Sequence, residues 1–138
     1  MTLTEIATTD VVTVDPDTEI RAVLTQMDER HVGSAVVTDG DDPTGIITDR
    51  MIAMAFRETD SVTDLVASDV MTDDLVTTSE DRTHYEVLET MRDEGIRRLP
   101  IVSDGTLSGI ITLDDLLMVT AAELSNASDV IERQASGS

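Results

Sequence analysis

The chain has 138 residues, 40% of them hydrophobic, which is enough for one compact domain or two small units that share a core. It contains no cysteine, so disulfides, thiolate metal sites and a cysteine nucleophile are excluded. Its 29 acidic and nine basic residues give a formal net charge of −20, which argues against nucleic acids and acidic membranes as partners.

The first predicted element is a β-prone stretch at residues 11–14, and a helix follows it. Asp15 and Pro16 supply a plausible N-cap and first helical residue for this helix. Its apolar face follows helical spacing and consists of Ile20, Val23, Leu24 and Met27. The pattern then predicts a buried strand at 35–37, a polar turn at 39–43, a strand at 45–47 and a helix that starts after Thr48.

The second half repeats this order at an offset of 64 residues, and Gly45-Ile46-Ile47-Thr48 matches Gly109-Ile110-Ile111-Thr112. Here Ser79 and Glu80 are the expected helix start, and the apolar face is His84, Val87, Leu88 and Met91. Pro100 lies within a short strand, so we expect that strand at a sheet edge or interrupted. The chain is thus an internal duplication of a β-α-β-β-α unit, an α/β layer arrangement.

The predicted domains are a first repeat at 3–58, a linker at 59–68, a second repeat at 69–125 and a polar, loose C-terminal tail at 126–138. Neither a signal peptide nor an apolar run of the roughly 20 residues of a membrane helix is recognisable. We therefore expect a soluble, cytoplasmic protein. The acidic composition resembles that of cytosolic proteins from salt-loving archaea, where molar salt shortens the Debye length to about 3 Å, and we expect a halophilic source.

Two β-α-β-β-α copies, each ending in Gly-Ile-Ile-Thr, resemble a pair of CBS domains, also called a Bateman module. The phrase Gly95-Ile96-Arg97-Arg98-Leu99-Pro100-Ile101-Val102 and the Met71-Thr72 pair strengthen the resemblance, which covers about residues 3–120. It implies a pseudo-twofold module with two clefts that bind AMP, ADP, ATP or S-adenosylmethionine. It also implies a homodimer that pairs through helices and regulates another protein, without catalysis or a catalytic cofactor.

The resemblance places the stronger ligand site in the second repeat. Thr112 and Asp115 would hold the ribose, a role that suits a carboxylate because it accepts hydrogen bonds from both hydroxyls. The purely structural alternative is a helix capping box, in which both side chains accept hydrogen bonds only from backbone N–H groups. Arg97 and Arg98 would reach the phosphate, or else form ordinary surface salt bridges. Val76 and Thr77 would flank the adenine, although plain core packing explains the valine equally well.

The first repeat departs from the family pattern. Thr48 is retained and Arg50 could face a phosphate, but Met51 replaces the ribose carboxylate and Gly33-Ser34 replaces the arginine pair. Val12 and Thr13 would flank the adenine here. We therefore expect this site to be weaker or empty. Asp114, beside the stronger site, should disfavour a highly charged phosphate tail and hence favour AMP or a neutral adenosyl group over ATP.

Three functions remain in competition. The first is a nucleotide-sensing module that signals to a partner protein. The second is a structural dimerisation or docking module with degenerate, empty clefts. The third, an enzyme, is disfavoured because we find no nucleophile–base pair, no P-loop and no metal cluster, and His31 and His84 stand alone.

Overall fold

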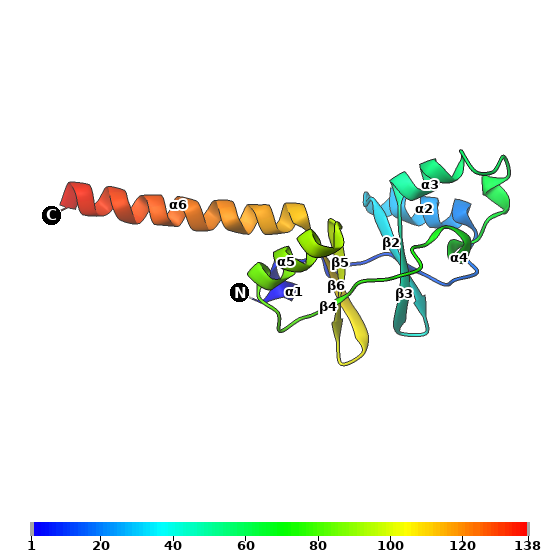
Figure 1. The fold of residues 1–138 in the computed structure, drawn as a ribbon, viewed down its shortest axis with the longest axis horizontal. Helices are drawn as coiled ribbons and strands as arrows, with labels where there is room; N and C mark the ends of the chain where they lie inside the picture. Colours follow the sequence, from blue (N-terminus) through cyan, green and yellow to red (C-terminus); the bar gives the residue numbers. More distant parts are fainter. Residues whose placement is uncertain (1, 138) are drawn as a thin grey trace.

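The computed structural model describes residues 2–137 and contains two units, each a small sheet with helices on its outer face (Figure 1). The first unit comprises β1 (Thr13–Val14), α2 (Ile20–Arg30), β2 (Ser34–Asp39), β3 (Asp42–Thr48) and α3 (Asp49–Ala55). The second comprises β4 (Thr78–Ser79), α5 (His84–Glu94), β5 (Arg98–Ser103), β6 (Thr106–Thr112) and α6 (Leu113–Gly137). Three short elements lie outside these units. The first, α1 (Leu3–Ile6), comes before the first unit, and the 3-10 turn η1 (Val62–Asp64) and α4 (Ala67–Val70) come between the two. The predicted duplicated α/β fold is confirmed.

The two sheets have the same topology. The strand orders are β1-β2-β3 and β4-β5-β6, with the first pair parallel and the second antiparallel in each sheet. The register shifts between Val37 and Thr38 in one sheet and between Ile101 and Val102 in the other, at positions related by the sequence repeat. Even this irregularity of the backbone is therefore duplicated.

The prediction that Pro100 marks an edge strand is wrong, because β5 is the central strand of its sheet. In the first sheet the N–H of Val36 donates to the carbonyl of Val12 at 2.9 Å. Pro100 occupies the equivalent position and has no N–H to donate. The parallel ladder of the second sheet accordingly begins one residue later, with Thr78 opposite Ile101. The proline is accommodated in the central strand because the paired part of β4 is displaced by one residue, while its length of two residues equals that of β1.

The predicted helix starts are also wrong. Asp15 forms a turn in which its carbonyl accepts from the N–H of Thr18 at 3.1 Å, and α2 begins only at Ile20, with Glu19 at the N-cap position but no side-chain cap. Ser79 belongs to β4, and α5 begins after Thr83. At Asp15 the turn is closed by Thr18, whose hydroxyl accepts from the N–H of Asp15 at 3.1 Å, and the Ser79 hydroxyl donates to the side chain of Asp81, so neither predicted side chain caps a helix. The predicted apolar faces are buried in part, since Leu24 remains 41% exposed.

A leading segment comes before each unit, at residues 3–10 for the first unit and 62–74 for the second. Each leading segment packs against the other unit. Leu3 is buried in the core of the second unit, whereas Val62 and Ala67 are buried in the core of the first. Backbone hydrogen bonds fix each exchange, with Thr8 paired to Ile110 and the N–H of Thr72 donating to Ile46. A third apolar cluster, built around Val36, Ile46 and Ile110, joins the two sheets. Packing thus crosses between the two repeats. The predicted bounds of the repeats, 3–58 and 69–125, stay a prediction.

A close approach accompanies one exchange. A Cβ atom added to Gly45 would lie 2.5 Å from the sulfur and 2.9 Å from the Cβ of Met71. Real Cβ contacts are longer than this, so β3 needs glycine where the segment after α4 crosses it.

The expectation of a loose tail is corrected, because α6 continues without a break to Gly137 and projects away from both sheets (Figure 1). Every residue from 121 to 137 is exposed. Polarity alone suggested a coil, but Leu124 and Ile131 continue the seven-residue spacing set by Leu117. Within residues 2–137 no helix is long and apolar enough to cross a bilayer.

Candidate functional site

A cavity of about 150 Å³, the central cleft, lies between the two repeats. Its walls come from the first repeat, the second repeat and the segment before β1, and consist of Thr8, Asp10, Val11, Val12, Val32, Gly33, Ser34, Arg98, Ile110 and Thr112. Apolar side chains, a guanidinium and hydroxyls therefore share one space. The volume is about half of the roughly 300 Å³ at which pockets for small molecules usually begin.

Opposite charges meet at the rim of the central cleft. A Cβ atom added to Gly33 would lie 3.3 Å from Nη2 of Arg98 and 3.4 Å from Oδ2 of Asp49, so both groups reach the backbone of Gly33. Asp10 is held in an ion pair by Arg30 at the end of α2. Arg98, which the structure leaves half-buried, thus brings a positive charge from the second repeat onto the first.

Thr112 and Asp115 form a reciprocal cap at the start of α6. The N–H of Thr112 donates to Oδ2 of Asp115 at 3.0 Å, and the N–H of Asp115 donates to Oγ1 of Thr112 at 3.2 Å. Such a pair satisfies two of the N–H groups that have no partner at a helix start. The capping alternative from the sequence is thus realised, with one oxygen of the carboxylate committed to it.

Asp115 also lines a second cavity, the α6 groove, of about 340 Å³. This groove is bounded by Ile6, Asp115, Met118, Val119, Ala122, Glu123 and Asn126. Thr112 lines the central cleft instead. The two residues that the resemblance assigns to the ribose are hydrogen-bonded to each other but border different cavities.

The other residues predicted for the stronger site are dispersed. Arg97 is exposed, and its Nη2 lies 3.6 Å from Oδ1 of Asp114. Val76 packs against the core of the second unit, and Thr77 is exposed. Of the predicted set, only Arg98 and Thr112 line the central cleft.

The residues predicted for the weaker site also divide. Val12 is buried and lines the central cleft, whereas Thr13 is exposed in β1. The Oγ1 of Thr48 caps α3 by accepting from the N–H of Met51 at 3.2 Å. Arg50 and Met51 line the α3 groove, a cavity of about 300 Å³ bounded by Arg50, Met51, Met54, Ala55, Glu58, Thr59, Leu65, Asp69 and Val70.

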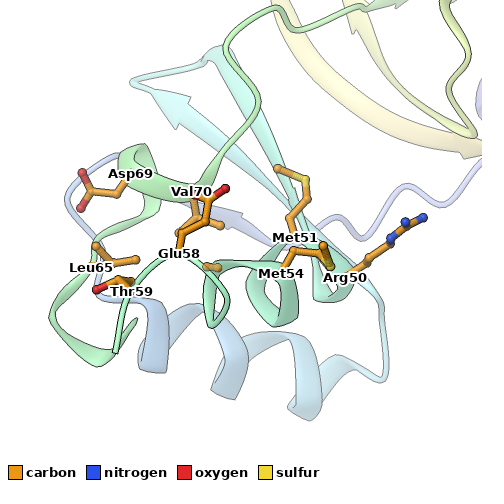
Figure 2. A pocket seen from close by; sticks show the side chains of 9 residues that line it. Arg50, Met51, Met54, Glu58, Thr59, Leu65, Asp69 and Val70 are labelled. Atoms are coloured by element: carbon orange, nitrogen blue, oxygen red, sulfur yellow. The ribbon is translucent and has the colours of Figure 1, made fainter. Parts of the chain in front are cut away.

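The α3 groove is the counterpart of the α6 groove. Met51 and Met54 stand where Asp115 and Met118 stand in the second repeat, and Val70 stands where Ile6 stands. Figure 2 shows Arg50 at one end of the α3 groove and Asp69 near the other. Each groove is thus formed by the helix that follows the last strand and by the leading segment of the other repeat.

Sequence reasoning missed Thr8 and Asp10 in the central cleft, and Asp49 at its rim. Thr8 and Asp10 match Thr72 and Asp74 in the second copy, so the repeat itself held a signal. The crossing of the leading segments, which carries these residues to the cleft, leaves no mark in the pattern. Within the described part of the chain, no group of three or more His, Asp or Glu side chains could hold a metal ion.

Comparison with known families gives one match, to the model described as CBS domain, which covers residues 3–58 and 66–122. An uncharacterized protein of Methanopyrus kandleri is 38% identical over 118 residues, which cover 83% of this chain and 60% of that protein. Inosine-5'-monophosphate dehydrogenase of Methanocaldococcus jannaschii is 38% identical over 115 residues, 82% of this chain and 22% of that enzyme. The chain therefore spans less than two thirds of the length of either relative.

A shorter relative and two solved structures match over most of their length. The CBS domain-containing protein YhcV of Bacillus subtilis is 33% identical over 79% of this chain and 78% of its own. The structure of a CBS-domain containing protein from Agrobacterium tumefaciens has a TM-score of 0.76 and 26% identity, and covers 87% of this chain and 99% of that one. The CBS domain of a membrane protein from Sphaerobacter thermophilus has a TM-score of 0.73 and 31% identity over 86% of each chain.

Proposed function

We propose that this chain, which belongs to the CBS domain family, senses an adenosyl ligand, with AMP favoured, and signals its presence to a partner protein. A CBS pair is a regulatory, signal-transduction module, and the ligand is the finer assignment that we add. The observation that carries it is the central cleft, where Thr112 and Arg98 of one repeat meet the apolar wall of Val11 and Val12 of the other.

The chemistry of the central cleft suits the parts of a nucleotide. Apolar walls accept a flat base, and the fixed fork of donors on Arg98 suits a phosphate. The cleft holds about 150 Å³ and opens to solvent, so a whole nucleotide would extend beyond it or would bind with the two repeats moved apart. A ligand that binds only the opened arrangement would shift the module toward it, and a partner could read that shift.

Asp115 is the proposed ribose acceptor. It lines the α6 groove and not the central cleft, so the proposal requires the ribose to reach from the cleft across the Thr112–Asp115 hydrogen bonds to the edge of that groove. A carboxylate has about four acceptor positions, so Asp115 can hold the N–H of Thr112 with Oδ2 and still accept from a sugar hydroxyl. The Asp114 carboxylate stands next to it on the chain and faces Arg97. A second and third phosphate would add negative charge near Asp114, which is why we favour AMP over ATP.

The proposed occupancy is asymmetric. Met51 offers no acceptor at the place of Asp115, and Ser34 no positive charge at the place of Arg98. A lost hydrogen bond to a charged group costs about 1.5–3 kcal/mol, roughly 10- to 150-fold in affinity. The first site, with Thr48, Arg50, Val12 and Thr13, should therefore be weaker or empty.

The second candidate is a structural module whose clefts stay empty. The reciprocal cap of Thr112 and Asp115 favours it, because this bond pair already explains both side chains. Under either function we propose that two copies pair through their helices. Exposed apolar side chains suit that role on three helices: Leu24 on α2, Met54 and the C-cap residue Phe56 on α3, and Tyr85 on α5.

Isothermal titration with AMP, ATP and S-adenosylmethionine in concentrated potassium chloride separates the two functions. Under the sensing function AMP binds, and Asp115→Asn weakens it about 10- to 150-fold while keeping an oxygen that can accept from Thr112. Asp104→Asn removes the same charge in the exposed β5–β6 turn and should leave affinity unchanged. If no ligand gives a heat of binding, the sensing function is wrong and the structural function stands. If both variants bind AMP with equal affinity, Asp115 is not part of the site.

A further inference from the structure

The second half of α6 carries an apolar surface that the rest of the chain leaves uncovered. With 100° between successive helical residues, one 120° sector holds the α6 stripe, which we define as Leu117, Ala121, Leu124, Ala127, Ile131 and Ala135. Leu117, Leu124 and Ile131 are 54%, 67% and 69% exposed. Their seven-residue spacing is the repeat of a helix that packs against another helix.

The propensity of this segment does not explain its helical structure. Ser125, Asn126, Ser128 and Asp129 are poor helix formers, so the intrinsic helix propensity of this stretch is low. Most helical stability in proteins comes from packing of an apolar face. Residues 121–137 are exposed throughout, so the rest of the described chain does not supply packing for this part of α6.

We infer that the α6 stripe binds the α6 stripe of a second copy of this chain. The charge pattern of α6 meets the condition that this occupant imposes. Two copies at −20 each repel one another, so an interface between them must exclude charge. The α6 stripe contains no charged residue, and Asp129, Glu132 and Arg133 lie outside its sector.

The available apolar surface lies along one face of α6. The stripe offers three large apolar side chains that are more than half exposed, spread over four turns of helix, whereas a standard interface takes roughly 800 Å² from each partner. Three alanines in the stripe let two helices approach closely. A twofold axis uses the same patch on both copies, so one stripe supplies both sides of the contact.

This inference rests on the proposed pairing of two copies, adds α6 to the helices proposed for it, and does not depend on the ligand. Leu124→Glu with Ile131→Glu places two charges in the stripe. Ser125→Glu with Ser136→Glu adds the same charge outside it, on the same exposed stretch. Sedimentation equilibrium in about 1 M potassium chloride, where the Debye length is about 3 Å, should give a dissociation constant at least tenfold weaker for the first pair only.

Disulfide trapping tests the contact directly, because the chain has no cysteine of its own. Single variants Leu117→Cys, Leu124→Cys and Ile131→Cys are compared with Asp129→Cys under mild oxidation. At least one stripe position should cross-link tenfold faster than position 129. In a parallel pair all three stripe positions should do so, whereas in an antiparallel pair only the one nearest the twofold axis should. Circular dichroism confirms that each variant is folded.

Two results would overturn the inference, and they differ in what else they remove. A dimer that forms equally in both glutamate pairs, with no faster cross-linking at the stripe, leaves pairing through other helices intact. A wild-type chain that stays monomeric at all concentrations removes the proposed pairing as well. Neither result touches the ligand proposal, which calorimetry measures separately.

Discussion

The two repeats share strand order, register and even the position of their β-bulges, yet they differ in how they start and end their helices and in what lines their grooves. Where the second repeat has Asp115, Thr83 and Gly95, the first has Met51, Glu19 and His31. The backbone tolerates both sets, so these positions are not what defines the fold. They are where one copy can differ from the other in stability and in ligand binding.

The largest expected effect comes from making the two grooves alike. Met51→Asp gives the first repeat the carboxylate of the second, and we expect AMP affinity at the first site to rise by about 10- to 150-fold. Titration calorimetry should then resolve a second binding event. Met54→Asp, one turn further along the same α3 groove, is the matched control and should add none. If Met51→Asp adds none either, the grooves are not equivalent in function.

The crossing segment provides the next comparison. Gly45→Ala would push its methyl group against Met71, and overpacking of this kind typically costs about 1–3 kcal/mol of unfolding free energy. Gly40→Ala serves as a control for the loss of glycine, because a Cβ atom there meets nothing within 4 Å. Its backbone φ of +64° carries a separate strain, which the control measures. Urea denaturation should show a larger loss at Gly45.

Helix capping distinguishes α5 from α2. Thr83 accepts from the N–H of Glu86 at 3.1 Å, and Glu86 accepts in return from the N–H of Thr83 at 3.2 Å, whereas Glu19 makes no side-chain cap. Thr83→Ala should cost about 1 kcal/mol in urea denaturation at neutral pH. Glu19→Ala should cost less, and equal losses would show that the cap does not matter in this fold.

The same cap predicts a pH effect with a definite sign. Hydrogen bonds from the backbone and side chain of Thr83 lower the pKa of Glu86 below its usual 4.5, with Arg82 as a weaker cause. A lowered pKa means stability that is full above the unfolded-state pKa and lost as pH falls through the folded-state pKa. Glu86→Gln should therefore lose less stability than wild type between neutral pH and pH values below 4.5.

The smallest expected effect concerns helix ends. α2 ends at His31 with φ of +54°, and α5 ends at the equivalent Gly95 with φ of +67°. A left-handed conformation disfavours side chains, so His31→Gly should stabilise the protein by about 0.5–1 kcal/mol. Gly95→Ala should destabilise it by a similar amount. Thermal unfolding of both variants checks this, and a loss in His31→Gly would mean that the imidazole has an unrecognised contact.

Much of the fold was predictable because the repeat appears twice in the sequence. Residues separated by the offset of 64, such as Gly45 and Gly109, predict the same backbone structure in both repeats. Pro100 and Asp15 misled because local rules for strands and caps were outweighed by the ladder and by turn formation. The α6 helix was missed because polarity was weighed without its seven-residue spacing.

The candidate site was less predictable. Thr112 and Arg98 were predicted for the same ligand site, and they line one cleft, but their role in ligand binding stays a prediction. Their neighbours Thr8 and Asp10 come from the segment before β1, which crosses over to β6. A repeat aligned with itself shows which residues correspond, but not which copy each residue touches.

The exchanged leading segments have a consequence for how the protein assembles. Cutting the chain between the repeats would take Leu3 away from one hydrophobic core and give neither half a complete set of partners, because Val62 and Ala67 belong to the other. Each half must therefore wait for contacts distant in sequence, which slows folding and couples the halves into one cooperative transition. A nick in the exposed stretch around residues 56–58 should accordingly leave the two fragments associated rather than release two small domains.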